Sequence, residues 1–212
     1  MKSTRFNPPL DWNPTIMGNN KTRSNRYFFG LNNLILQISE RFSFPYRENT
    51  KMIEIGCYSG ESTLLFASSM AFDHIYCIDP FDGFEMMNDI SGKDWSEIKE
   101  EFDFNTKYFD GDGSQLGETK VELIQDYSYN VVDKFEDNSI DFVYIDASHK
   151  LEDITRDINL YIPKLNEGGI IAGHDYNWPG VREYIDSLAG KNLVKFADES
   201  WAIVKEDING EI

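Results

Sequence analysis

The chain has 212 residues, 41% of them hydrophobic and 14% aromatic, which is typical of one folded domain and not of a disordered segment. Its 37 acidic and 20 basic residues give a net charge of −17, which would repel nucleic-acid phosphates and anionic membranes. The sequence has no run of 18 apolar residues, no apolar leader and only two cysteines, so we expect a cytoplasmic protein with buried free thiols at Cys57 and Cys77.

The N-terminal part divides into an irregular arm and a helix. Residues 1–29 are rich in Asn, Pro and other polar residues, and we interpret them as an arm that precedes one domain over residues 30–212. From Leu31 the apolar residues Leu34, Ile35 and Ile38 recur at helical spacing. This pattern predicts a helix with one buried face.

The stretch from Met52 to Thr63 predicts a buried strand, a glycine turn and the start of a helix. Gly56 and Gly60 allow a sharp turn and a close approach of a ligand, and the helix start attracts an anion such as a carboxylate or phosphate. The spacing differs from the G-x-G-x-x-G of dinucleotide-binding proteins, which argues against NAD. Taken alone, the turn is equally compatible with an ordinary α/β connection.

The next predicted strand, residues 74–79, ends at Asp79. A carboxylate roughly 20 residues after the glycine turn is where α/β nucleotide-binding proteins hold ribose hydroxyls, although an Asp before Pro80 is also a common turn cap. Asp94 and Glu97 then have the spacing of a capping box, which predicts a helix start.

Three further strands are predicted over residues 121–124, 140–146 and 170–175, the last after Gly168 and Gly169. Asp126 and Tyr127 follow the first of them, Asp146 ends the second, and His174 and Asp175 end the third. A helix follows Pro179, and residues 193–196 and 201–204 read as a closing hairpin.

Acids therefore fall at or near the carboxyl ends of four successive strands. These acids are Glu54, Asp79, Asp126 and Asp146. Because the carboxyl ends of parallel strands share one edge of a sheet, we expect these side chains to line one cleft.

With these motifs the sequence resembles class I methyltransferases that use S-adenosylmethionine, and among them the small-molecule O-methyltransferases that include macrolide-sugar and catechol enzymes. The resemblance covers roughly residues 50–205 and includes Ile145-Asp146-Ala147-Ser148-His149 and Gly173-His174-Asp175-Tyr176. It implies a Rossmann-like, doubly wound α/β fold with strand order 3-2-1-4-5-7-6 and an antiparallel last strand.

The resemblance also implies where the cofactor binds. The segment from Glu54 to Ser62 would hold the methionine part, Asp79 the ribose, and Asp126 with Tyr127 the adenine. The implied cofactor-binding residues are Glu54, Gly56, Ser59, Gly60, Ser62, Asp79, Pro80, Phe81, Asp126, Tyr127 and Asp146.

The metal-dependent relatives hold a divalent cation with carboxylates at the fourth and fifth strand ends. The implied metal ligands are Asp146, His174 and Asp175, with His174 standing where relatives often carry an acid. Oxygen ligands suit Mg²⁺, and an imidazole shifts the preference toward Mn²⁺. His149 matches the general base of these enzymes, and Asp146 is the second implied catalytic residue.

The function expected from the resemblance is O-methylation of a small hydroxylated molecule, such as a sugar or secondary metabolite. Metal-independent methylation of nitrogen or carbon is an alternative, and so is a domain that keeps the nucleotide pocket without transfer chemistry. The expected partner is a small-molecule substrate. We expect binding to neither nucleic acid nor a membrane, and the sequence leaves open whether the protein forms a homo-oligomer.

Overall fold

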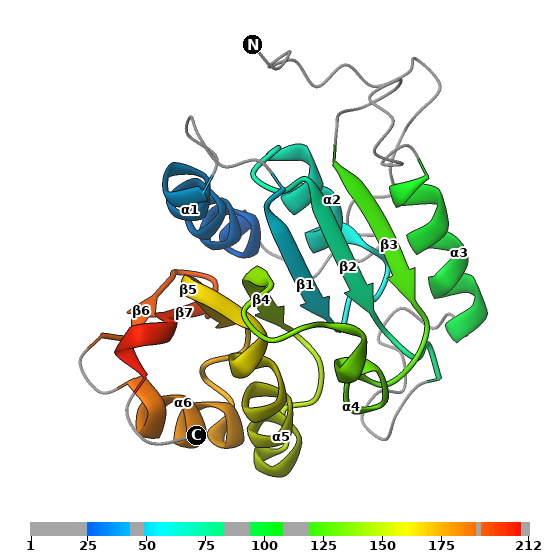
Figure 1. Ribbon diagram of the computed structural model, residues 1–212. Coiled ribbons are helices and arrows are strands. Elements are labelled where there is room, and N and C mark those ends of the chain that lie inside the picture. Colours follow the sequence, from blue (N-terminus) through cyan, green and yellow to red (C-terminus); the bar gives the residue numbers. More distant parts are fainter. Residues whose placement is uncertain (1–24, 43–48, 83–93, 108–118, 190–191, 209–212) are drawn as a thin grey trace.

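The computed structural model describes residues 25–42, 49–82, 94–107, 119–189 and 192–208 (Figure 1). Its centre is a seven-stranded sheet in the order β3-β2-β1-β4-β5-β7-β6. The strands are β1 (Lys51–Ile55), β2 (His74–Ile78), β3 (Lys120–Ile124), β4 (Ile140–Ile145), β5 (Leu165–Gly173), β6 (Val194–Lys195) and β7 (Trp201–Val204). Strands β1 to β5 are parallel, and β7 is antiparallel to β5 and β6. The predicted strand order and antiparallel last strand are confirmed.

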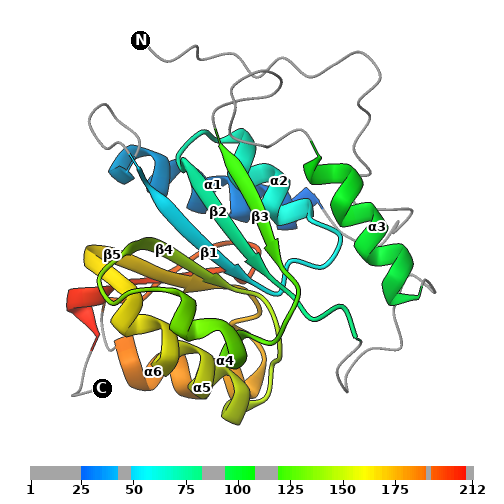
Figure 2. The same cartoon turned by 45° about the vertical axis from the view of Figure 1, so that its right-hand side comes forward.

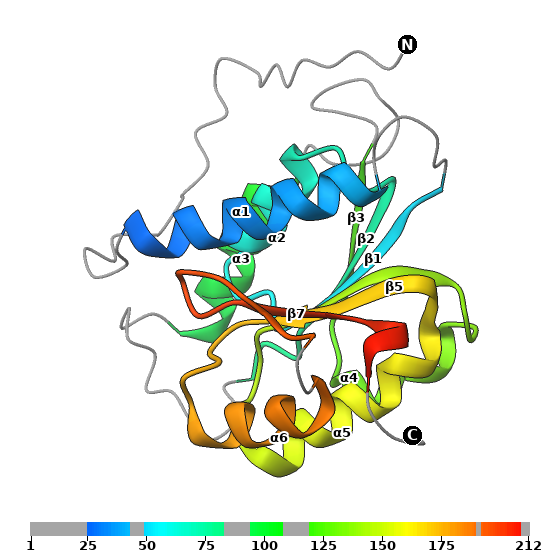
Figure 3. The same ribbon diagram turned by 90° about the vertical axis from the view of Figure 1, so that its left-hand side faces the viewer.

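Helices cover both faces of the sheet. Figure 2 shows α1, α2 and α3 on one side and α4, α5 and α6 on the other, and Figure 3 shows the same two layers from another direction. The helices are α1 (Asn25–Phe42), α2 (Glu61–Ser68), α3 (Trp95–Thr106), α4 (Ser128–Val131), α5 (Leu151–Tyr161) and α6 (Pro179–Ala189), with 3₁₀ turns at Val132–Lys134, Ile162–Lys164 and Lys205–Asp207.

Two hydrophobic cores form because successive strand residues point to opposite faces of the sheet. In β1, Met52 packs in the core under α1 to α3, whereas Ile53 packs in the core under α4 to α6. In β4, Tyr144 packs in the core under α1 to α3, and Val143 packs in the core under α4 to α6. Parallel strands buried on both faces explain the nearly continuous apolar runs in the sequence.

The predicted start of α3 is confirmed. The Asp94 carboxylate accepts the backbone N–H groups of Ser96 and Glu97 at 2.9 and 3.0 Å, so it caps the first turn. Helix α1 begins at Asn25, so residues 25–29 of the predicted arm are helical, and residues 1–24 lie outside the described part of the chain.

Strand β5 begins earlier than predicted. The sequence reading places Gly168 and Gly169 before the strand, but both lie within Leu165–Gly173. Gly168 has φ +71°, and the pairing with β4 changes register between Ile140 and Phe142. The glycines therefore accommodate an irregularity inside the strand instead of ending the preceding segment.

The predictions for the two thiols are confirmed: Cys57 and Cys77 are free and buried. Among the described residues, no helix combines the length and apolar character that crossing a membrane requires.

Candidate active site

The glycine turn between β1 and α2 lies directly against the loop that follows β4. Gly56 has φ +81°, and a Cβ atom added to it would lie 2.3 Å from the carbonyl oxygen of Asp146. The Asp146 N–H in turn donates to Ile55 O at 2.9 Å. Gly60, with φ +80°, occupies the N-cap position of α2 and makes no side-chain cap. Only glycine fits at Gly56, and its absent side chain brings two candidate ligand-binding loops together.

Glu54 lies in β1 and is fully buried. Its carboxylate accepts hydroxyl hydrogen bonds from Ser62 and, at 2.5 Å, from Thr63, both in the first turn of α2. Burial is the main reason that its pKa rises to about 7, and the Asp146 charge adds to this rise against the opposing effect of the two hydroxyls. Through these contacts Glu54 joins β1 to the first turn of α2 and so stabilises the glycine turn between them. Its direct contact with a cofactor stays a prediction.

The raised pKa of Glu54 predicts a loss of stability at higher pH. The carboxyl binds its proton more tightly in the folded protein than in the unfolded chain. Stability is therefore lost as pH rises from the unfolded pKa near 4.5 through the folded pKa near 7. At 1.36 kcal/mol per pKa unit the loss is bounded at about 3 kcal/mol.

Urea unfolding of the wild type and Glu54→Gln across this pH range measures the effect. Glutamine keeps the shape of the side chain and cannot titrate, so the free energy of unfolding of the variant should vary less with pH. The same pH dependence in both proteins would contradict the assigned pKa.

Asp79, at the end of β2, is buried and holds the glycine turn from the other side. Its Oδ2 atom accepts the N–H groups of Cys57 and Tyr58 at 3.0 Å each, and its Oδ1 atom accepts the N–H of Phe81 at 2.9 Å. Burial raises the pKa of Asp79, although these hydrogen bonds oppose the rise. Since a carboxylate offers about four acceptor positions and three are used here, Asp79 retains capacity for about one ribose hydroxyl.

Asp126 and Tyr127 follow β3 and are partly exposed. Asp126 Oδ1 accepts the Tyr127 N–H at 2.7 Å and the Asn130 side-chain amide at 2.8 Å, and these bonds lower its pKa. The Tyr127 hydroxyl donates to Asp82, which raises the pKa of Tyr127 to about 12. Tyr127 thereby links the loop after β3 to the loop after β2, where the adenine and ribose were predicted.

The other predicted cofactor residues surround this turn. Ser59 and Ser62 are buried, and the Ser59 carbonyl accepts the Asn105 side-chain amide at 2.8 Å. Phe81, with φ +53°, packs edge-on against Phe102. Pro80 is partly buried beside them, and its carbonyl accepts a weak hydrogen bond from Gln125 at 3.4 Å.

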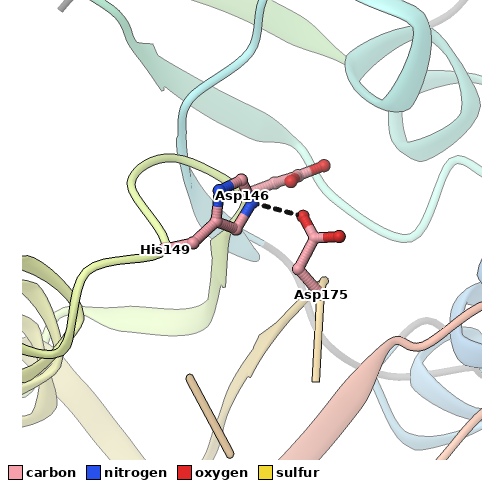
Figure 4. A group of neighbouring side chains, drawn as sticks. All are labelled: Asp146, His149 and Asp175. Atoms are coloured by element: carbon pink, nitrogen blue, oxygen red, sulfur yellow. Dashed lines mark hydrogen bonds and ion pairs between the residues drawn. The ribbon is translucent and has the colours of Figure 1, made fainter. Parts of the chain in front are cut away.

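Three side chains from the ends of β4 and β5 form a cluster, which Figure 4 shows. The His149 Nε2 atom is 2.6 Å from Asp175 Oδ2, and Asp146 lies beside this pair. One ligand atom each from Asp146, His149 and Asp175 can be chosen so that all lie within 4.8 Å of one another. Donor atoms at such separations can share one ion at ordinary metal–ligand distances.

The cluster stabilises the charged forms of its members. Burial alone would raise the pKa of Asp175, but hydrogen bonds from His149 and His174 hold it well below its usual range. Burial would lower the pKa of His149, but the hydrogen bond to Asp175 and the charges of Asp175 and Asp146 raise it. An imidazole paired with a partly buried carboxylate is the arrangement of an oriented general base.

His174, a predicted metal ligand, is outside the three-residue cluster. Its Nδ1 atom is 3.2 Å from Asp175 Oδ1, and its backbone carbonyl accepts the indole N–H of Trp201 at 3.1 Å. Burial lowers its pKa, but Asp175, Asp146 and Asp198 together raise it to about 9. Asp146 and Asp175 thus form a group with His149 whose ligand atoms are close enough to share an ion, and His174 borders this group through Asp175.

Sequence reasoning missed two features of the site. The exposed Trp178 stacks on the His149 ring at 4.6 Å between centroids, and the only sequence signal was its position three residues after Asp175. The second feature is a pair of acids in α5. Asp157 accepts a hydrogen bond from Ser128, which follows Tyr127, and Asp153 accepts one from Ser148, which lies between Asp146 and His149. Their four-residue spacing was visible, but it is equally typical of a solvent-exposed helix face.

The described residues fit S-adenosylmethionine and a divalent cation. The uncapped start of α2 suits the methionine carboxylate, Asp79 has acceptor capacity for a ribose hydroxyl, and Gly56 leaves the turn free of a side chain. Two carboxylates and one imidazole are ligands for Mg²⁺ or Mn²⁺. The residues that would hold these two groups adjoin at the Gly56–Asp146 contact.

A sheet of this order, with a glycine turn after β1 and acids in and after β1, β2 and β4, defines a class I methyltransferase domain, the fold of enzymes that use S-adenosylmethionine. A family described as "Methyltransferase domain" matches residues 53–176, more than half of the chain, and the chain belongs to this family.

Individual relatives are distant. An uncharacterized protein of Acanthamoeba polyphaga mimivirus is 27% identical over 154 residues, which cover 68% of this chain and 64% of that protein. The chain thus spans less than two thirds of this curated relative. Among solved structures, a protein of Corynebacterium glutamicum has a TM-score of 0.55 at 15% identity over 81% of this chain and 80% of that one, a likeness of fold alone. The cofactor-bound protein Rv0187 from MTB has a TM-score of 0.49 at 13% identity, over 82% and 89% of the two chains.

Proposed function

We propose that the chain is an O-methyltransferase that transfers the methyl group of S-adenosylmethionine to a small hydroxylated molecule, such as a sugar or secondary metabolite, with the help of a divalent cation. The observation that carries the proposal is the cluster of Asp146, His149 and Asp175 next to the glycine turn. The net charge of −17 further favours a small acceptor over a nucleic acid or an anionic membrane.

In the proposed reaction, Asp146, Asp175 and His149 have separate roles. Bound S-adenosylmethionine supplies an electrophilic methyl group, and a divalent cation held by Asp146 and Asp175 would lower the pKa of the acceptor hydroxyl. His149 donates from Nε2 to Asp175 in its neutral form, so Nδ1 is the basic nitrogen that takes the hydroxyl proton. Asp175 orients the ring and stabilises the imidazolium that results.

A metal-independent enzyme that methylates nitrogen or carbon is the second candidate. One observation favours it: His149 and Asp175 already form a complete base and orienting pair through their 2.6 Å contact. In that case Asp146 and His149 would orient the acceptor without an ion, and the His149–Asp175 pair could take any proton that the acceptor loses.

Metal removal separates the two candidates. Purified protein is incubated with S-adenosylmethionine labelled in the methyl group and with panels of hydroxylated, amino and carbon-acid acceptors. For the proposed function, we expect labelled methyl ethers, loss of turnover with EDTA, and recovery with Mn²⁺ or Mg²⁺. Transfer to nitrogen or carbon that EDTA leaves unchanged would establish the second candidate instead.

A further inference from the structure

Helix α5 holds both loops that carry the candidate cofactor and catalytic residues. In the loop after β3, the Ser128 hydroxyl donates to Asp157 Oδ1 at 2.6 Å. In the loop after β4, the Ser148 hydroxyl donates to Asp153 Oδ2 at 2.7 Å. Asp153 and Asp157 are four residues apart, so they lie on the same face of the helix. One helix face therefore anchors both loops.

The two anchoring acids are buried close to each other. Asp153 is 5% exposed and Asp157 is 4% exposed. Burial is the main cause of the raised pKa of Asp157, and the charge of Asp153 raises it further. Two carboxylates in this position would repel each other, and a nearby cation offsets that repulsion.

Arg156 supplies that cation. Its Nη2 atom is 3.0 Å from Asp153 Oδ1, whereas its Nε atom is 3.6 Å from Asp157 Oδ1, an ion pair too long for a hydrogen bond, and the side chain is 40% exposed. The guanidinium also lies over the Tyr129 ring, 4.5 Å from its centroid, and Tyr129 stacks on Tyr127 at 5.2 Å. Arg156 thus connects both acids with the aromatic pair beside the predicted adenine position.

We propose that Arg156 is a positioning residue that couples the cofactor loop after β3 to the catalytic loop after β4. It holds Asp153 and Asp157 together, and through Ser148 and Ser128 it fixes the loops that carry His149 and Tyr127. The inference rests on the proposed function, because that function assigns the two loops to the cofactor and to catalysis.

The test uses one readout for each loop. The dissociation constant of S-adenosylhomocysteine, measured by calorimetry, reports on the loop after β3. The imidazole NMR signal of His149 in the ligand-free protein reports on the loop after β4. The chain has three histidines, so its imidazole spectrum is simple and His149→Gln assigns the signal.

Arg156→Met should change both readouts. We expect the dissociation constant to rise on the order of tenfold, as for other residues that position a ligand-binding group, and the His149 signal to shift while that of His74 stays in place. Ser128→Ala should change only the dissociation constant, and Ser148→Ala only the His149 signal. Arg156→Lys should have an intermediate effect, since lysine keeps the charge without the planar fork.

Lys164→Met is the matched control. It removes a cation that pairs with an acid, Asp137, at 2.7 Å, and should change neither readout. Urea unfolding confirms that each variant is folded under the assay conditions, and if Arg156→Met is not, Arg156→Lys and the two serine variants decide. A folded Arg156→Met that changes one readout or neither overturns the proposal. Wild-type protein that binds no S-adenosylhomocysteine would instead overturn the proposed function, because the His149 signal is measured without ligand.

Discussion

Asp79→Ala should weaken the binding of S-adenosylhomocysteine at least tenfold. A hydrogen bond to a charged group contributes about 1.5 to 3 kcal/mol, and each 1.4 kcal/mol corresponds to a factor of about ten in affinity. Asp79 also accepts three backbone N–H groups that shape the glycine turn, so the variant loses both ligand contacts and loop order. Calorimetry measures the change, with Asp137→Ala as a control at an exposed acid.

An analogue without ribose hydroxyls separates the two causes. If Asp79 binds those hydroxyls, the 2′,3′-dideoxy form of S-adenosylhomocysteine should bind weakly to the wild type and lose little more with Asp79→Ala. A double-mutant cycle with the two ligands and two proteins isolates this coupling. Additive losses would assign Asp79 to the glycine turn alone, and an unchanged dissociation constant would remove it from the site.

Most of the fold could be predicted from the sequence because parallel strands that are buried on both faces appear in the sequence as short, nearly continuous apolar runs. Short apolar runs ending in an acid gave β2 and β4 within a residue of their observed ends. The start of β5 was wrong because Gly168 and Gly169 usually interrupt strands, and only the three-dimensional pairing shows that they continue this one.

The composition of the catalytic cluster was harder to predict. The resemblance to metal-dependent methyltransferases suggested His174 as a metal ligand beside Asp175. However, Asp175 has φ +57°, a left-handed conformation that an extended strand does not contain, so the chain turns just where the strand ends. His149, which is 26 residues away in the sequence, approaches Asp175 at 2.6 Å, and His174 contacts the other carboxylate oxygen at 3.2 Å.

The anchoring function of α5 was hidden for a different reason. Asp153, Arg156 and Asp157 have the residue types and spacing of a solvated helix surface. Asp153 and Asp157 are nevertheless buried, where they accept hydrogen bonds from Ser148 and Ser128, which follow two other strands. A single sequence gives no indication of such long-range pairing.

His149→Gln should reduce turnover of the identified acceptor by about 10² to 10⁴, the usual contribution of a positioned general base. The glutamine amide can still donate to Asp175 but cannot take a proton. The dissociation constant of S-adenosylhomocysteine should stay unchanged, because His149 is not among the predicted cofactor-binding residues, which lie on the glycine turn, in the loops after β2 and β3, and at Asp146. Steady-state kinetics with labelled cofactor measures the loss.

His74→Gln provides the matched control. His74 lies at the start of β2, at the opposite end of the sheet from the cluster, where it contacts Glu122 at 3.2 Å and stacks on Tyr76. Its substitution should leave turnover unchanged. If His149→Gln retains turnover within a few-fold of the wild type, the proton must leave by another route, and His149 would be left to hold an ion or to orient Asp175. A variant that loses turnover and also releases bound Mn²⁺ would identify His149 as a metal ligand, because a base acting beside the ion leaves the two carboxylate ligands in place.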